Sequence, residues 1–127
     1  MQPAVWRDDF RAMGCAVRLE LVGGDEALAV SGFSRSRNLI AELEQAWSRF
    51  LPESDISKLN AAQGAMVPVH SATIELLRAM IQGSVATDGC FDPTLLAPLV
   101  ALGYDASWSD PRILTSLPEG VTWRGSV

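Results

Sequence analysis

The chain has 127 residues, a length typical of one domain, and its 48% apolar residues are enough to form a buried core. Charged residues make up 20% of the chain, and with this apolar content they argue against a disordered protein. The net charge is −5 and no two Lys or Arg residues are adjacent, which argues against a nucleic-acid-binding or anionic-membrane surface.

The first predicted elements are strands. Residues 15–22 alternate apolar with polar side chains, the period of a half-buried strand. Residues 10–13 are also expected to be extended, with Gly14 marking a bulge or a close approach of the backbone. The pair Gly23-Gly24 predicts a turn, and Asp25 is expected to cap the helix that follows.

A long helical pattern extends from Asp25 to about Phe50. One face carries four apolar side chains, namely Leu39, Ile40, Leu43 and Trp47. Ser31 and Gly32 weaken the early part, so the helix is expected to begin late or to bend there. Pro52 ends it. A short helical turn over residues 54–60 follows, capped by Ser54 or Asp55.

The second half of the chain continues with helices. Residues 67–69 predict a short extended piece, and Pro68 favours an edge position. Ser71 is expected to cap a helix that ends at Asp88-Gly89. Its predicted buried stripe consists of Ile74, Leu77, Ile81 and Val85. A short apolar helix follows, with Pro98 at its first position and Gly103 just after its end.

The last segment changes in character. Residues 105–119 are rich in Ser, Asp and Pro and are expected to form a loop. Residues 122–124 are typical of the start of a strand. The sequence therefore predicts an α+β fold with a mixed or antiparallel sheet and packed helices, forming an incomplete domain.

Most familiar catalytic signatures are missing from the sequence. There is no Cys/His metal spacing, no dinucleotide-binding glycine motif and no phosphate-binding loop. The single histidine, His70, is interpreted as a solvated loop residue rather than a catalyst. Cys15 and Cys90 form no spacing motif, so free thiols are favoured over a disulfide.

Three polar or flexible positions each allow two interpretations. Met13-Gly14 is a core methionine with a bulge, or a place where a flat ligand contacts the backbone. Asn60 is a helix C-cap, or an amide that holds a nucleotide. Asp92 caps its own turn through Thr94, or its carboxylate accepts hydrogen bonds from a ligand whose ring is covered by Phe91.

Three blocks of the sequence stand out when they are taken together. The first is Phe10-Arg11-Ala12-Met13-Gly14. The second is Trp47-Ser48-Arg49-Phe50, followed by residues 52–60. The third is Thr87-Asp88-Gly89-Cys90-Phe91-Asp92-Pro93-Thr94, with Pro98-Leu99-Val100 and Gly103-Tyr104 after it. Together the blocks resemble the ApbE-like FAD:protein FMN transferases, because they stand in the order and at the approximate spacing of that family and cover about residues 10–104.

The resemblance implies a reaction. Members of that family cleave FAD with the help of Mg²⁺ and transfer FMN to a Thr or Ser hydroxyl of a target protein, releasing AMP. Some members instead hydrolyse FAD to FMN and AMP. The implied partners are FAD and a flavoprotein subunit of a redox complex, and the charge and hydropathy of the sequence indicate no nucleic-acid partner and no membrane span.

The resemblance also implies a set of cofactor-binding residues. The family's FAD contacts map onto Met13, Phe50, Asn60, Cys90, Phe91 and Asp92 of this sequence. Ser57 and Thr94 belong to the same motifs. Cys15, Cys90 and Phe50 depart from the family's usual Thr, Ala and Tyr, and these modest changes leave the pocket plausible.

The C-terminal part of the family's pattern has no counterpart here. The family continues into a Gly-rich Asp-Gly-Gly segment, a catalytic His region and the side chains that hold Mg²⁺. We therefore expect residues 1–127 to be an N-terminal portion of such a domain, with no catalytic residue and no metal ligand, and inactive alone. A non-catalytic FAD-binding module and a truncated remnant are the alternatives.

The sequence also bears on location in the cell. The first ten residues carry Arg7, Asp8 and Asp9 and lack an apolar segment of the kind found in secretory signals. The longest apolar run, residues 95–102, is too short for a membrane span. The expectation from these observations is a cytoplasmic protein.

Overall fold

A computed structural model describes residues 2–106 of the chain. It divides into an N-terminal unit, residues 1–68, and a C-terminal unit, residues 69–127. The described elements are β1 (Val5–Ala12), β2 (Cys15–Val22), α1 (Glu26–Trp47), α2 (Asp55–Ala61), α3 (Ser71–Ala86) and α4 (Leu96–Ala101). The predicted α+β class with an antiparallel sheet is confirmed. The strand predicted over residues 122–124 lies outside the described residues.

The two strands form an antiparallel hairpin whose faces differ in polarity. The pairing runs from Val5 opposite Val22 to Ala12 opposite Cys15. One face is half-buried and carries Trp6, Asp8, Phe10, Val17, Leu19 and Leu21. The other face carries two directly opposed ion pairs, Arg7 with Glu20 at 2.8 Å and Asp9 with Arg18 at 2.7 Å. The alternation in residues 15–22 therefore predicted β2 correctly.

The hairpin turn corrects the prediction for Gly14. Strand β1 begins at Val5, earlier than predicted, and ends at Ala12. Met13 and Gly14 then form a two-residue turn with φ values of 52° and 73°. Positive φ at both central residues is the geometry of the tight hairpin turns that match the twist of the strands. Gly14 is therefore a turn residue and not a bulge.

Helix α1 begins directly after its predicted N-cap, Asp25. The Asp25 carboxylate accepts a hydrogen bond from the Leu28 N–H at 2.8 Å, which satisfies a free amide of the first turn. The helix continues without a break through Gly32, so the predicted late start is wrong. A helical glycine costs only about 1 kcal/mol relative to alanine, which a 22-residue helix tolerates. The helix ends at Trp47, three residues before the predicted end at Phe50.

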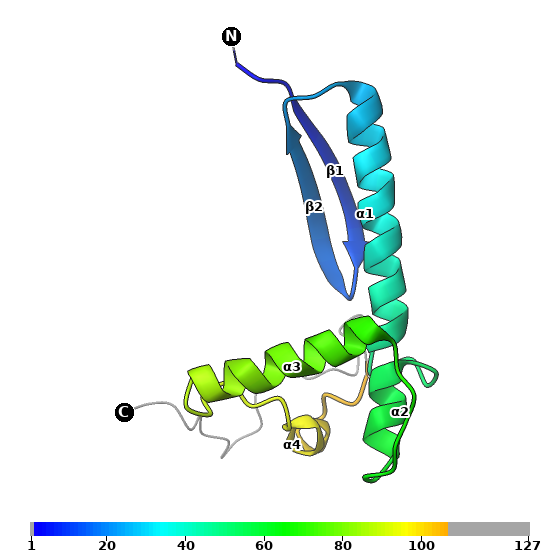
Figure 1. Cartoon of the computed structure of the whole chain (residues 1–127), viewed down its shortest axis with the longest axis vertical. Coiled ribbons are helices and arrows are strands. Elements are labelled where there is room, and N and C mark those ends of the chain that lie inside the picture. The colour runs from blue at the N-terminus through cyan, green and yellow to red at the C-terminus, as the bar shows by residue number, and fades with distance from the viewer. Residues whose placement is uncertain (1, 107–127) are drawn as a thin grey trace. The chain divides into compact units, whose positions relative to one another are not determined.

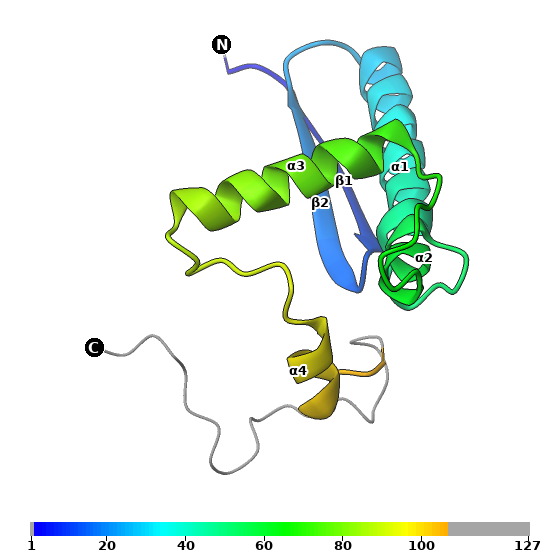
Figure 2. The same cartoon turned by 60° about the horizontal axis from the view of Figure 1, so that its bottom comes forward.

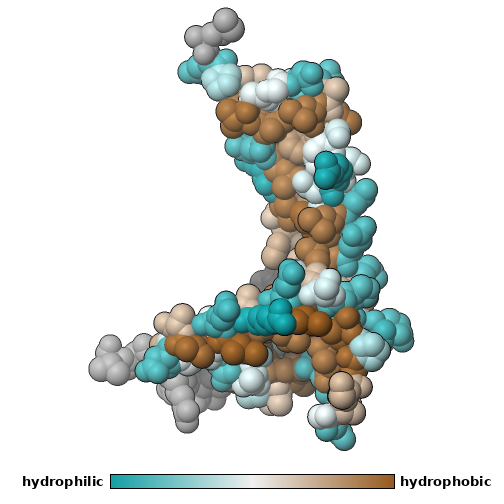
Figure 3. Space-filling model, viewed as in Figure 1, coloured by the Kyte–Doolittle hydropathy of each residue, from teal (hydrophilic) through white to brown (hydrophobic). Residues whose placement is uncertain are grey.

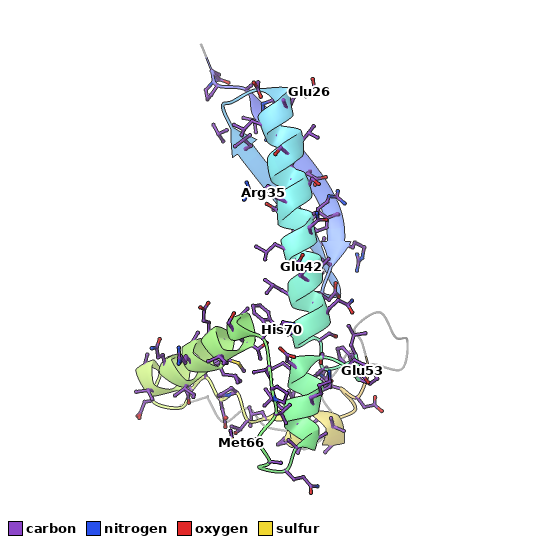
Figure 4. The ribbon with its side chains drawn as sticks, turned by 45° about the vertical axis from the view of Figure 1, so that its right-hand side comes forward. Glu26, Arg35, Glu42, Glu53, Met66 and His70 are labelled. Carbon is purple, nitrogen blue, oxygen red and sulfur yellow. The ribbon has the colours of Figure 1, made fainter. Side chains whose placement is uncertain are left out.

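The hairpin lies along α1 (Figures 1 and 2) and is joined to it by Arg37. The Arg37 guanidinium donates to both carboxylate oxygens of Asp8, with Nε 2.6 Å from Oδ2. Its Cζ atom also lies 4.3 Å from the centroid of the Phe10 ring, a cation–π arrangement. Elsewhere on α1, Glu26, Arg35 and Glu42 are exposed (Figure 4). One side chain of α1 thus contacts two residues of the half-buried sheet face.

Helix α2 also starts at its predicted cap. The Ser54 hydroxyl accepts a hydrogen bond from the Ser57 N–H at 3.0 Å, and Ser54 is 1% exposed. Residues 67–69, predicted as a short extended piece at an edge position, are not paired in a strand in the described part of the chain. Pro68 has no N–H to contribute to a sheet, which is consistent with this outcome.

Helix α3 starts one position earlier than predicted. Its N-cap is His70, whose carbonyl accepts from the Thr73 N–H at 3.0 Å, so Ser71 is the first helical residue. The predicted end is confirmed, because Asp88 takes a φ of 51° and the Gly89 N–H donates to the Ser84 carbonyl at 2.8 Å. This is the pattern of a left-handed helix end.

Helix α4 ends in the same way, at the glycine that the sequence indicated. Gly103 has a φ of 91°, and the Tyr104 N–H donates to the Leu99 carbonyl at 3.0 Å. The start differs from the prediction, because α4 begins at Leu96 and Pro98 is its third residue. Proline is compatible with this position, since the first turn of a helix has free amides.

The predicted buried stripe of α3 is not buried. Ile74, Ile81 and Val85 are 42%, 62% and 77% exposed, and Leu77 is half-buried. Among residues 2–106 the buried apolar residues are Ala29 and Ala106. Apolar side chains therefore lie on the surface of both units, as the brown areas of Figure 3 show. Within the described residues, no helix is both long and apolar enough to span a membrane.

Candidate functional site

The first candidate residue, Met13, lies at the tip of the hairpin. Its side chain is 46% exposed, so the interpretation as a core methionine is wrong. Met13 adopts a positive φ, which costs a residue other than glycine roughly 1–2 kcal/mol. A contact from outside the hairpin adds to the strand pairing that holds this turn.

That contact comes from Glu44, near the C-terminal end of α1. The Met13 N–H donates to the Glu44 carboxylate at 3.1 Å. Arg11 adds a weaker contact within the turn, because its guanidinium donates to the Gly14 carbonyl at 3.3 Å. No motif in the sequence pointed to Glu44, since it is 31 residues from Met13 and resembles any other helical glutamate.

The second candidate, Phe50, lies in the segment that leaves α1. The Arg49 guanidinium covers one face of its ring, with Cζ 4.1 Å from the centroid. The Phe50 side chain is 41% exposed. The Phe50 N–H also donates to the Ser48 hydroxyl at 3.4 Å. An exposed aromatic ring with a cation on it is suited to contact a flat ligand.

Helix α2 fixes this segment from the other side. The Ser57 hydroxyl donates to the Arg49 carbonyl at 3.2 Å, while its N–H is bound by Ser54. Asp55 follows Ser54 and is only 4% exposed. The sequence did not predict that the Asp55 carboxylate is buried, although its position directly after a Ser at a helix start favours a carboxylate with a structural role.

The third candidate, Asn60, lies in the last turn of α2. The C-cap of this helix is Ala62, so the interpretation of Asn60 as the cap is wrong. Asn60 is exposed, and its amide makes no hydrogen bond to the described residues. Its two donors and one acceptor are therefore available to a ligand.

Phe91 lies in the loop after α3, and two residues of that helix hold it. Its N–H donates to the Thr87 hydroxyl at 2.9 Å, and that hydroxyl donates to the Gly83 carbonyl at 2.8 Å. A Cβ atom on Gly83 would lie 3.3 Å from Cδ1 of the Phe91 ring, so the ring packs over this glycine. The ring is still 46% exposed.

Asp92 forms the turn that the sequence suggested. Its Oδ1 atom accepts from the Thr94 N–H at 2.8 Å and from the Thr94 hydroxyl at 2.6 Å. These bonds, the hydroxyl first, lower the pKa of Asp92 below its usual value, so the carboxylate is charged at neutral pH. Among the described residues, Oδ2 has no hydrogen-bond partner. The capping role and a ligand-accepting role are thus compatible.

Cys90 completes this loop. Its N–H donates to the Thr87 carbonyl at 3.0 Å, and its thiol is free and exposed, as is that of Cys15. The six candidates divide evenly between the units: Met13, Phe50 and Asn60 belong to the N-terminal unit, and Cys90, Phe91 and Asp92 to the C-terminal unit. All except Cys90 offer an exposed apolar, aromatic, amide or carboxylate group of a kind that contacts a nucleotide or a flat ring.

The described residues do not fit a magnesium site. Mg²⁺ takes several oxygen ligands in a near-octahedral arrangement. No group of three or more His, Cys, Asp or Glu side chains that could hold a metal ion lies among residues 2–106. No chemical step is therefore assigned to a metal on these residues.

A two-stranded antiparallel hairpin packed on one long helix, with further helices after it, defines an α+β protein. Residues 13–123 match the ApbE family, and this range contains all six candidate residues. The chain belongs to the ApbE family.

A solved structure supports the same assignment. The apo form of the flavinyl transferase ApbE from Pseudomonas stutzeri is similar to the chain, with a TM-score of 0.72 and 26% sequence identity. The similarity covers 82% of this chain and 34% of that one, so the chain spans about a third of the length of this relative. No curated protein sequence matches the chain.

Proposed function

We propose that this chain supplies part of the FAD site of an FAD:protein FMN transferase. Such an enzyme moves FMN from FAD to a Thr or Ser of a target flavoprotein, a subunit of a redox complex, and releases AMP. The observation that carries this proposal is the family match over residues 13–123, together with the similarity to a flavinyl transferase structure. Residues 1–127 are proposed to be the N-terminal portion of that enzyme's domain.

The chemistry of the candidate residues supports binding of FAD. The exposed rings of Phe50 and Phe91 offer apolar faces to a flat heterocycle, and Met13 offers a polarisable side chain. Asn60 and the open carboxylate oxygen of Asp92 offer hydrogen bonds to polar edges. We assign Cys90 a backbone contact in the same loop, since a thiol is a weak donor.

Titration of FAD into the 127-residue chain tests this proposal. We expect saturable quenching of flavin fluorescence. Asp92→Asn keeps the oxygen that caps the turn but removes the charge, and it should weaken FAD binding about tenfold, since hydrogen bonds to charged groups contribute roughly 1.5–3 kcal/mol. Glu42→Gln makes the same change on the exposed part of α1 and should bind as the wild type does. Absence of saturable binding would contradict the proposal.

Catalysis by the chain alone is a separate question. Because the described residues offer no metal site, we expect no release of AMP when the chain is incubated with FAD and excess Mg²⁺. Chromatography of the nucleotides measures this directly. Release of AMP and FMN without labelled protein would identify the alternative, a Mg²⁺-dependent FAD pyrophosphatase. The cytoplasmic location expected from the sequence stays a prediction.

A further inference from the structure

The loop that carries Cys90, Phe91 and Asp92 is organised by one hydroxyl group. Thr87 follows the last residue of α3, and its Oγ1 atom both donates and accepts. It donates to the Gly83 carbonyl at 2.8 Å, with the Ser84 carbonyl further away at 3.4 Å. It accepts from the Phe91 N–H at 2.9 Å. A hydroxyl has one hydrogen and two acceptor positions, so Thr87 is suited to join the helix end to the loop.

The backbone turns sharply between these contacts. Asp88 and Gly89 take φ values of 51° and 79°, and the Cys90 N–H donates to the Thr87 carbonyl. The chain therefore reverses within four residues and returns to the helix at Phe91. Without the Thr87 hydroxyl, the Phe91 amide would lose its acceptor.

Gly83 determines where the Phe91 ring lies. A Cβ atom at this position would be 3.3 Å from Cδ1 and 3.5 Å from Cε1 of the ring. The first distance is shorter than most Cβ contacts, so a side chain at this position would shift the Phe91 ring by a few tenths of an ångström. One turn of α3 thus holds the backbone of Phe91 through Thr87 and its ring through Gly83.

We propose that Thr87 and Gly83 are positioning residues for FAD, acting through Phe91 and Asp92. The inference rests on the proposed function and extends it to residues that need not touch the ligand. Phe91 and Asp92 lie next to each other, so a displaced Phe91 backbone also moves the carboxylate. A flat ligand with polar edges would need the Phe91 ring and the Asp92 carboxylate at a fixed distance from each other, and the contacts of Thr87 and Gly83 maintain that distance.

The pair Thr87→Val and Thr87→Ser tests the hydroxyl. Valine keeps the shape of threonine and removes the hydroxyl, whereas serine keeps the hydroxyl. We expect Thr87→Val to raise the Kd for FAD about tenfold, because one amide loses its acceptor. Thr87→Ser should bind within about twofold of the wild type. Amide hydrogen exchange at Phe91 should be faster in Thr87→Val only.

The variant Gly83→Ala separates a role in positioning the loop from a role in folding, because the two roles predict different changes in Tm and in the Kd for FAD. Alanine favours helices over glycine by about 1 kcal/mol, so the Tm of this variant should not fall. Its added Cβ atom displaces the Phe91 ring, so the Kd for FAD should rise several-fold. Weaker binding with unchanged or higher stability would separate positioning from folding.

The outcomes distinguish this inference from the proposed function. If the wild-type chain binds FAD and both Thr87→Val and Gly83→Ala bind equally well, the inference is wrong and the proposed function stands. If the wild-type chain does not bind FAD, both are wrong. If Thr87→Val fails to fold, Gly83→Ala decides, because an unchanged Kd in that variant overturns the inference.

Discussion

The contacts that join the hairpin to α1 differ in kind from the contacts that hold the loop after α3. Arg37 and Glu44 of α1 contact Asp8 and Met13, which are 29 and 31 residues away in sequence. In the loop after α3, the bonds of Thr87 and Asp92 join residues two to four positions apart. The hairpin therefore depends on charged side chains that reach between elements, whereas the loop depends on local hydroxyl, carboxylate and backbone groups.

Replacing Arg37 by methionine should have the largest effect on the N-terminal unit. The change removes both bonds to Asp8 and the contact with the Phe10 ring, while leaving a side chain of similar length. We expect a clear fall in Tm, measured by circular dichroism. Arg35→Met is the matched control on the same helix, because Arg35 is exposed, and it should leave Tm unchanged. Equal Tm values for the two variants would show that Arg37 does not hold the hairpin.

The same ion pair gives a dependence of stability on pH. The Arg37 hydrogen bonds lower the pKa of Asp8 below its ordinary value of 3.8. The resulting stabilisation is complete above pH 3.8 and is lost as the pH falls through the lower, folded-state pKa. Arg37→Met should lack this component, which acid titrations of both proteins at constant ionic strength would detect.

Gly14→Ala should have the next largest effect. Gly14 has a φ of 73°, and alanine in this conformation costs roughly 1–2 kcal/mol. Urea unfolding should show this loss in the free energy of unfolding. Gly32→Ala is the contrasting variant, since a Cβ atom there meets no neighbour within 4 Å and the site is helical. Gly32→Ala should raise the free energy of unfolding by about 0.5–1 kcal/mol. A lower free energy of unfolding in Gly32→Ala would show that backbone conformation does not explain the difference between the two glycines.

Ser54→Ala should have a smaller effect, confined to α2. The variant loses the hydrogen bond from the Ser57 N–H at a position that is 1% exposed, and loss of a helix cap costs about 1 kcal/mol. Ser34→Ala on the exposed part of α1 should change the free energy of unfolding by less than about 0.5 kcal/mol. Indistinguishable urea midpoints would show that the cap does not stabilise the unit.

Glu44→Ala should have the smallest effect, and it concerns the hairpin tip. The Met13 N–H loses its acceptor, which costs about 1 kcal/mol or less at an exposed site. Hydrogen exchange at the Met13 amide should become faster. Glu44→Gln retains an acceptor oxygen and should protect this amide as the wild type does. Unaltered exchange of the Met13 amide in Glu44→Ala would show that Glu44 does not stabilise the turn.

The sequence predicted several local features of the chain correctly. Asp25, Ser54 and Gly103 have side-chain or backbone chemistry that decides their own neighbourhood within a few residues, and the structure confirms all three. The turn formed by Asp92 with Thr94 is of the same kind. The resemblance to the ApbE family also came from short contiguous motifs and is confirmed.

The long-range contacts could not be predicted in this way. Nothing in the neighbourhood of Arg37 or Glu44 distinguishes them from other charged residues of an exposed helix. The apolar stripe of α3 shows a second limit, because spacing identifies an apolar face but not what covers it. Gly14 shows a third, since a glycine after a strand is compatible with both a bulge and a tight turn.

The small number of buried apolar residues has a thermodynamic consequence. The heat capacity change on unfolding and the slope of stability against urea both grow with the surface that unfolding exposes to water. In residues 2–106, Ala29 and Ala106 are the fully buried apolar residues, so most of the apolar surface that unfolding exposes comes from half-buried side chains, each of which adds less than a fully buried one. The stability curve of this chain should therefore be flatter against temperature than that of a compact domain of equal length, and its urea transition should be broader.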